Sequence, residues 1–455
     1  MAGQYCTRLV FKVHRQDPIL IKPSKPTPHE FKPLSDIDDQ DGLRVQIPVI
    51  HFYPYNNNNN INYDDDPGQV MKDAIAKALV FYYPLAGRLI EGPNRKLIVE
   101  CSGEGVMFIE ADAPEVSLEG FGELGPPFPC IEELLFDVPG SHGMINTPLL
   151  LFQMTRLKCG GIVLAIRLNH AVSDAAGLMQ FMLAIRDIAH RAESPRIKPV
   201  WERHLLNARF PPRVTCKLHE YDQLVDTKEK LPASKMTHRS FFFGPNQVSA
   251  IRSLTPLDLR QCSTFEILTA FMWRHRTVAL QLDPNEEVRI ICIVNARNKF
   301  NPPLPSGYYG NCTAYSVAKT TAGELTGTPL GYALKLVREA KGNVTEEYMR
   351  SIADLMVTKG RPWYTMVGSY LVSDVTRAKF LEMDFGWGKP IFGGPAKGNV
   401  ASFHVKHTNK KGESGVLVTL CISAPAMERL VKELDGLLKG NSSGDGAIKQ
   451  PKSAL

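Results

Sequence analysis

Residues 148–188 constrain the fold most, because a strand pattern changes to a helical one within this stretch. Two runs rich in β-forming residues, separated by residues 158–161, predict two adjacent strands, the second ending at His170. Apolar residues then recur at steps of three and four, which predicts an amphipathic helix with Ser173 as its N-cap. The recurring residues are Leu178, Phe181, Met182, Ile185 and Ile188. A strand leading into a helix is typical of α/β proteins, which bind ligands beyond such strand ends.

The rest of the chain mixes strand and helix patterns in the same way. After a polar insertion at residues 56–68, the spacing of Val70, Met71, Ala74, Ile75, Ala78 and Leu79 predicts a helix. Two apolar runs within residues 96–112 flank a turn-like stretch at residues 102–105, which predicts a hairpin. Later, "SFFFG" predicts a strand, residues 263–282 a helix, and "VRIICIVNAR" a buried strand. The patterns together predict an α/β protein with mixed sheets.

The length predicts two domains. A chain of 455 residues exceeds the size at which a single core stops growing, and 44% hydrophobic with 22% charged residues is ordinary globular composition. The proline- and charge-rich residues 192–233 predict a crossover between an N-terminal domain, residues 1–191, and a C-terminal domain, residues 234–439. We expect a site in the cleft between them and a disordered tail at residues 440–455.

Charge, cysteines and hydropathy exclude several classes of protein. A net charge of +6 without a Lys/Arg block argues against nucleic-acid binding and leaves an anionic small molecule open. Nine scattered cysteines without a C-x-x-C argue against a disulfide framework and a zinc site, and favour a reducing compartment. No apolar stretch is long enough to span a membrane, and charges interrupt any N-terminal signal. We expect a cytoplasmic protein, with the peroxisome as an alternative because the final "SAL" resembles the S-K-L signal.

The stretch "RLNHAVSDAAG" contains the first candidate site. A neutral imidazole such as that of His170 accepts a proton near pH 7, provided that its other nitrogen is held. Asp174, four residues on, could supply that hold, or it could fix the loop by pairing elsewhere. A partly buried histidine followed by a first-turn aspartate has a purely structural interpretation too. The spacing alone leaves these alternatives open.

A second motif, "DFGWGKP" at residues 384–390, follows about 210 residues later. The two motifs in this order resemble those of the plant BAHD acyltransferases, which transfer acyl groups from coenzyme A thioesters to alcohols or amines. The resemblance continues through "LSDIDDQDGLRVQIPVIHFY", "VFYYPLAGRLIEGPNRKL", "PVWERHLLNARFPPRVTC", "CIVNAR" and "LPSGYYGN". It is greatest to the branch of alcohol acyltransferases that includes benzyl alcohol O-benzoyltransferases.

The resemblance implies a fold, a reaction and substrates. Two similarly sized α/β domains would enclose a channel at their interface, with His170 near its middle. His170 would act as general base while acyl-CoA, as co-substrate, donates its acyl group directly to an alcohol, without a metal or a permanently bound cofactor. Benzoyl-CoA and benzyl alcohol are the expected pair. The alternatives are an acetyl-CoA-dependent aliphatic alcohol acyltransferase and a lyase or non-catalytic homologue. We expect a monomer.

The resemblance also implies roles for residues of the second half. Ser373, in "VSDVTR", would donate a hydrogen bond to the oxyanion, although an ordinary turn serine is an equal interpretation. Ser263 and Thr264 would lie near the phosphopantetheine or 3′-phosphate of CoA, because a helix N-terminus with hydroxyl groups binds phosphate. A plain N-cap explains the same two residues.

For the aspartates of the two motifs, Asp174 and Asp384, the resemblance implies structural roles. Asp174 would turn away from substrate and pair with Arg297 of "VNAR". Asp384 would belong to a motif that lies away from the reacting atoms and would have a structural role, which makes catalysis by Asp384 the minority interpretation of a candidate set that comprises His170, Asp174 and Asp384. The structural residues of the second motif would be Gly386, Trp387 and Gly388.

Two other enzyme classes match short patterns. "GNSSG" at residues 440–444 fits the serine hydrolase pattern G-x-S-x-G, but no strand precedes it. "HVKH" offers His404 and His407 to a metal, but in a strand these would point to opposite faces, and no carboxylate completes the set.

Overall fold

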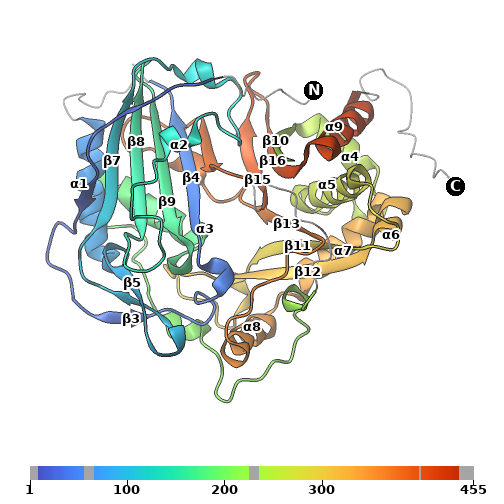
Figure 1. Cartoon of the computed structure of the whole chain (residues 1–455), viewed down its shortest axis with the longest axis horizontal. Helices are drawn as coiled ribbons and strands as arrows, with labels where there is room; N and C mark the ends of the chain where they lie inside the picture. The colour runs from blue at the N-terminus through green and yellow to red at the C-terminus, as the bar shows by residue number, and fades with distance from the viewer. Residues whose placement is uncertain (1–8, 56–65, 225–234, 399–400, 440–455) are drawn as a thin grey trace.

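The computed structural model describes residues 9–55, 66–224, 235–398 and 401–439. Two large sheets stand side by side, each with helices on its outer side (Figure 1). In Figure 1 the sheet of the first half lies on the left, and the sheet of the second half lies between it and the helices on the right. One face of the second sheet is therefore directed at the first half.

The first sheet has seven strands in the order β1-β7-β8-β9-β4-β14, with β2 also on β7. Only the β7–β8 pair is parallel. The bounds are β1 His14–Arg15, β2 Ile19–Ile21, β4 Gln46–Tyr53, β7 Val106–Ala113, β8 Leu150–Leu157, β9 Ile162–Asn169 and β14 Phe392–Pro395. The helices of this half are α1 Pro67–Phe81, α2 Ile131–Leu134 and α3 Ala175–Ala189.

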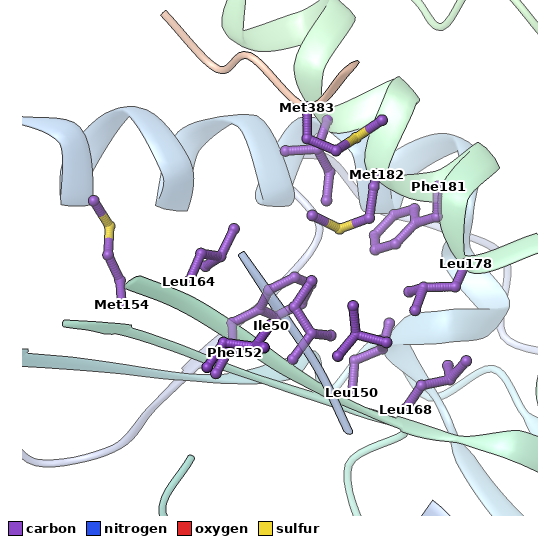
Figure 2. Close-up of a cluster of buried hydrophobic side chains, with 14 of the residues drawn as sticks. Ile50, Leu150, Phe152, Met154, Leu164, Leu168, Leu178, Phe181, Met182 and Met383 are labelled. Atoms are coloured by element: carbon purple, nitrogen blue, oxygen red, sulfur yellow. The ribbon is translucent and has the colours of Figure 1, made fainter. Parts of the chain in front are cut away.

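The two long helices, α1 and α3, form as their spacing predicts, because the periodic apolar residues of each are buried except for Val70, which is half-buried. Figure 2 shows Leu178, Phe181 and Met182 of α3 above the strand residues Phe152 and Leu168. The expected N-cap was wrong, since α3 is capped by the carboxylate of the next residue, Asp174.

The second sheet has the order β10-β16-β15-β13-β11-β12. Its bounds are β10 Met236–Phe243, β11 Glu287–Asn295, β12 Thr313–Thr321, β13 Ser369–Asp374, β15 Ser402–Thr408 and β16 Ser414–Ser423. Its helices are α4 Pro245–Ser253, α5 Thr264–Leu280, α6 Ala322–Gly327, α7 Leu330–Asn343, α8 Glu346–Lys359 and α9 Ala424–Lys439. Because β13 runs parallel to both β11 and β15, the carboxyl ends of these three strands point the same way.

The expected hairpin within residues 96–112 does not form. Its first strand, β6 Leu97–Glu100, pairs with β3 Phe31–Pro33 and β5 Arg88–Glu91 in a separate sheet of three strands, whereas its second strand is β7. Gly105 lies between them with φ of 102°, and a Cβ there would lie 2.3 Å from the Ile21 carbonyl oxygen. Close approach to another strand redirects the chain here, instead of a hairpin turn.

Strand β14 crosses from the second half of the chain into the first sheet. It pairs antiparallel with β4, and Gly393 lies opposite His51. The loop that carries "DFGWG" therefore packs on the first half, and Met383 joins the buried cluster under α3 in Figure 2. A division of the chain at residue 234 does not follow the sheets, because this segment is exchanged.

The crossover contains two short 3₁₀ turns, η6 Arg203–Leu206 and η7 His219–Tyr221, within the described part of residues 192–233. Glu220 of η7 is fully buried, and the Tyr348 hydroxyl of α8 donates to both of its carboxyl oxygens, at 2.8 and 2.7 Å. Burial raises the pKa of Glu220 to about 7, although the Tyr348 hydrogen bonds act in the opposite direction. The crossover is thus anchored by a carboxyl group that ionises near neutral pH.

Replacing Glu220 should remove a pH-dependent loss of stability. Because its folded pKa of about 7 exceeds the usual value of 4.5, the wild type should lose stability as the pH rises between these values, by roughly 3 kcal/mol. Urea unfolding at pH 5 and pH 8 should show a smaller loss for Glu220→Gln than for the wild type. The exposed Glu193→Gln is the control, and equal losses in all three proteins would contradict the prediction.

Candidate active site

His170 lies directly after β9, in the 3₁₀ turn η5 His170–Val172, and α3 follows within five residues. The strand-to-helix junction predicted from the sequence is confirmed. The His170 amide donates to the Val45 carbonyl at 2.8 Å, which ties the turn to the chain just before β4. The ring is half-buried, so that it is shielded without being sealed into the core.

The imidazole of His170 is held by its own turn. Its Nδ1 lies 3.1 Å from the backbone carbonyl oxygen of Ser173. Because a carbonyl oxygen only accepts, this hydrogen bond requires the proton on Nδ1. Nε2 then carries the lone pair, and the ring can accept a proton there.

Asp174 is turned away from the imidazole. Its carboxylate receives two hydrogen bonds of 2.8 Å from the Arg297 guanidinium, one to each oxygen, and further bonds from the Gly177 amide at 3.0 Å and the Cys312 amide at 3.1 Å. The structure thus brings together the pair expected from the resemblance. The i+4 carboxylate holds α3 to the second half and leaves the orientation of the histidine to the Ser173 carbonyl.

The environment of Asp174 favours its ionised form. Burial alone would raise the pKa of this carboxyl group, but the charge of Arg297 and the hydrogen bonds hold the pKa below its usual value. Arg297 begins the turn η10 Arg297–Lys299 that follows β11, and it also donates to the Gly310 carbonyl at 2.5 Å. A bidentate ion pair, with the aspartate buried and the arginine partly exposed, therefore joins the strand-end turn of one sheet to that of the other.

Asp384 organises its own loop. Its Oδ1 accepts from the amides of Gly386, at 2.9 Å, and Gly388, at 3.0 Å, which have φ of 119° and 102°. Such values favour glycine, so the two motif glycines are explained by the turn. Trp387 packs beside this turn, with its ring 6.0 Å from that of Tyr53.

The backbone of Asp384 meets the far end of α3. Its carbonyl oxygen lies 2.9 Å from Nε2 of His190, the C-cap of that helix. A helix of 15 residues is about 22 Å long. Since His170 precedes the N-terminus of α3, the structure does not bring Asp384 to the histidine.

Ser373 lies near the end of β13 on the inner face of the second sheet. Leu371, two residues earlier and hence on the same face, is buried against Leu43 of the first half. Ser373 is half-buried and stands opposite Ile293 of β11, the strand that leads to Arg297. Its hydroxyl is thus directed to the side of the sheet that faces the first half.

Ser263 and Thr264 stand at the N-terminus of α5. Ser263 forms a capping box with Glu266, in which the Glu266 carboxylate accepts from the Ser263 amide and hydroxyl, both at 2.8 Å. Lys341 pairs with the same carboxylate at 2.8 Å, and Arg252 lies 3.5 Å from the Thr264 hydroxyl. Helix capping accounts for Ser263, while two cations flank the helix start.

The two competing patterns find no site in the described residues. His404 and His407 lie on opposite faces of β15, where they contact Phe265 and Phe392 respectively. The pattern "GNSSG" lies outside the described residues, as does the tail expected to be disordered. Across residues 9–55, 66–224, 235–398 and 401–439, no group of three or more His, Cys, Asp or Glu side chains could hold a metal. The described helices include none that is long and apolar enough to cross a membrane.

Comparison with known proteins shows the family to which the chain belongs. A sequence profile of the Transferase family matches residues 11–437. The chain belongs to this family, the BAHD acyltransferases. A benzyl alcohol O-benzoyltransferase of Petunia hybrida is 60% identical over 453 residues, which are 98% of each chain. Alcohol acyltransferase 1 of Actinidia deliciosa is 51% identical over 429 residues, or 94% of this chain and 93% of the relative.

Solved structures show the same fold. Vinorine synthase matches with a TM-score of 0.73 at 23% identity, over 94% of this chain and 98% of its own. TRI101 of F. sporotrichioides, complexed with coenzyme A and T-2, matches with a TM-score of 0.66 at 17% identity, over 89% of this chain and 97% of its own. The predicted mixed α/β fold with two domains is confirmed. So is the predicted enzyme class, since this BAHD protein is an acyl-CoA-dependent O-acyltransferase.

Three buried residues that support the His170 turn of this BAHD protein were missed in the sequence, two by bonding to its carbonyls and the third by bonding to those two. They are Asp38, Arg203 and Asn311, which come from three distant segments. Each lies within a run that resembles the family, namely "LSDIDDQ", "PVWERHLLNARF" or "LPSGYYGN". The resemblance was visible, but no spacing rule links three residues so far apart.

Breaking the Asp174–Arg297 pair should cost much of the stability, because Arg297→Gln leaves the buried Asp174 carboxylate without its partner and Asp174→Asn leaves the half-buried guanidinium without its carboxylate. We expect Asp174→Asn and Arg297→Gln each to lower the free energy of unfolding by about 3 to 5 kcal/mol. In a double-mutant cycle by urea unfolding, the coupling should exceed about 1 kcal/mol.

The exposed pair Lys379–Glu382 serves as control, and its coupling should stay below about 1 kcal/mol. Additive effects for Asp174 and Arg297, with only turnover reduced by Asp174→Asn, would mean instead that the aspartate serves the histidine directly.

Proposed function

We propose that this protein transfers the benzoyl group of benzoyl-CoA to benzyl alcohol, giving benzyl benzoate and CoA, with His170 as the general base. The observation that carries the proposal is the hydrogen bond from His170 Nδ1 to the Ser173 carbonyl, which leaves Nε2 able to accept a proton. The substrate pair is supported by the nearly full-length similarity to benzyl alcohol O-benzoyltransferases.

The transfer proceeds without a covalent enzyme intermediate. Nε2 of His170 takes the hydroxyl proton as the alcohol oxygen attacks the thioester carbonyl carbon, and a tetrahedral oxyanion forms. The carbon–sulfur bond then breaks, and the departing CoA sulfur takes the proton from Nε2. The ring is neutral again after each turnover, so a single histidine serves as base and then as acid.

The oxyanion requires a hydrogen-bond donor, for which we propose the hydroxyl of Ser373. Support comes from its place on the inner face of the second sheet. Ser373 stands opposite Ile293 of β11, and Ile293 precedes Arg297 by four residues. Arg297 is in turn bonded to Asp174, the residue that caps α3, so the end of β11 beside Ser373 leads to the turn that contacts the His170 segment.

For acyl-CoA we propose contacts at the start of α5. The backbone N–H groups of a helix N-terminus bind phosphate, and Arg252 and Lys341 add positive charge beside it. Because the capping box occupies the Ser263 hydroxyl, the Thr264 hydroxyl is the group better placed to meet a phosphate oxygen.

Asp384 we assign a structural role, together with Gly386, Trp387 and Gly388. Its carboxylate is satisfied by amides of its own loop, and about a helix length separates it from His170. For the compartment we propose the cytoplasm, because all eight cysteines that the structure describes are free thiols.

The purified protein should release free thiol and form benzyl benzoate from benzoyl-CoA and benzyl alcohol. A panel of aromatic and aliphatic acyl-CoAs against alcohols, analysed by mass spectrometry, tests this. Higher kcat/KM with acetyl-CoA and aliphatic alcohols would favour the function of the alcohol acyltransferase relatives. Failure of every pair would indicate a lyase or a non-catalytic homologue.

His170→Ala should lower kcat by about 10²-fold or more, because a positioned base contributes that much. The dissociation constant for CoA, measured by calorimetry, should change little, since the ring acts at the reacting atoms. His142→Ala, at an exposed histidine, is the matched control and should retain wild-type turnover. Near-normal turnover in His170→Ala would return His170 to a structural role.

A further inference from the structure

The backbone carbonyl groups of the His170 turn are held from outside by two buried side chains. Asn311 Nδ2 donates to the His170 carbonyl at 2.8 Å and lies 3.2 Å from the Ala171 carbonyl. Arg203 Nη2 donates to the Val172 carbonyl at 2.9 Å. The next carbonyl, that of Ser173, accepts the hydrogen bond from Nδ1 of the His170 imidazole. Each carbonyl of the turn therefore has a named donor.

Asp38 joins the two donors into one unit. Its Oδ1 accepts hydrogen bonds from the backbone N–H of Asn311 at 2.8 Å and from the side-chain Nδ2 of Asn311 at 2.9 Å. Its Oδ2 accepts one from Arg203 Nη1 at 2.8 Å. Asp38 and Asn311 are fully buried, and Arg203 is 2% exposed. Burial would lower the pKa of Arg203, but the charge of Asp38 raises it, so the guanidinium stays charged.

The orientation of the Asn311 amide follows from its surroundings. All three groups near Nδ2, one carboxylate and two carbonyls, are acceptors, so the NH₂ group must face them. The amide therefore donates to the carboxylate and to the turn at once.

We propose that Asn311, held by the buried Asp38–Arg203 pair, is the positioning residue for the general base. The direction of the imidazole is set by a carbonyl of its own turn, and among the described residues no carboxylate forms a hydrogen bond or ion pair with the ring. Whatever fixes the backbone of residues 170–173 therefore fixes Nε2. Asn311 does this from the second half of the chain, and Arg203 does it from the crossover.

The kinetic part of this inference rests on the proposed function, because it requires that His170 act as base. A shift of about 1 Å in a reacting group can cost about 10²-fold in rate. Loss of the Asn311 amide should therefore lower kcat, while KM for acyl-CoA, which depends on contacts elsewhere, should hold.

Asn311→Ala is the variant that tests the proposal. Removing Asp38 would leave Arg203 buried without its carboxylate and would endanger folding, whereas Asn311 is uncharged. Ser316→Ala is the matched control, because the buried Ser316 hydroxyl also bonds to a backbone carbonyl, that of Ala340, behind the second sheet.

We expect kcat of Asn311→Ala to fall by about 10- to 100-fold with KM for acyl-CoA within about twofold, and Ser316→Ala to keep the wild-type kcat. An unchanged kcat, a rise in KM alone, or an equal loss of kcat in Ser316→Ala would overturn the proposal.

Hydrogen exchange of the backbone amides of residues 170–173, followed by mass spectrometry, supplies a readout that needs no substrate. Exchange should be at least about tenfold faster in Asn311→Ala than in the wild type, and unchanged in Ser316→Ala. If the wild type were inactive with every substrate pair, the proposed function would fail, yet this exchange would still decide whether Asn311 holds the turn. Unaltered exchange in Asn311→Ala would overturn the positioning role.

Discussion

The ion pair between the buried Asp174 and the half-buried Arg297 is the contact on which the rest of the site depends. A buried pair adds little net stability over an apolar contact, because both charges lose their hydration. Its value here is geometric. The bidentate bonds allow one register between the turn after β9 and the turn after β11, and the same carboxylate caps α3. The position of His170 relative to the second sheet follows from that register.

Those elements that depend on neighbours in the sequence were predictable. The helices α1 and α3 follow from apolar spacing, and β9 from a run that ends in a turn, because period and burial are local properties. The prediction of a hairpin was wrong because a close contact between Gly105 and Ile21, which is far away in the sequence, sets the direction of the chain there. The exchange of β14 into the first sheet could not be predicted, since four residues of strand carry no record of their partner.

In the candidate site, too, residues marked by their neighbours in the sequence were predictable, and residues brought together by the fold were not. His170 could be found because a strand end, a helix start and a motif coincide in one stretch. Arg203 and Asn311 lie 165 and 273 residues from Asp38, and only the folded chain shows that the three meet. The capping residue of α3 was missed by one position because both Ser173 and Asp174 suit an N-cap, and the Ser173 hydroxyl is drawn instead to the Tyr309 carbonyl.

The two motifs that are about 210 residues apart are connected by a single helix. At the N-terminus of α3, Arg297 binds the capping carboxylate of Asp174, and at the C-terminus the carbonyl of Asp384 bonds to the capping His190. Both partners come from the second half of the chain, although α3 covers the first sheet. A helix held at one end could still pivot, whereas one held at both ends keeps its axis and the turn before it. The second motif is therefore tied to the far end of the helix that follows His170, about a helix length from the imidazole.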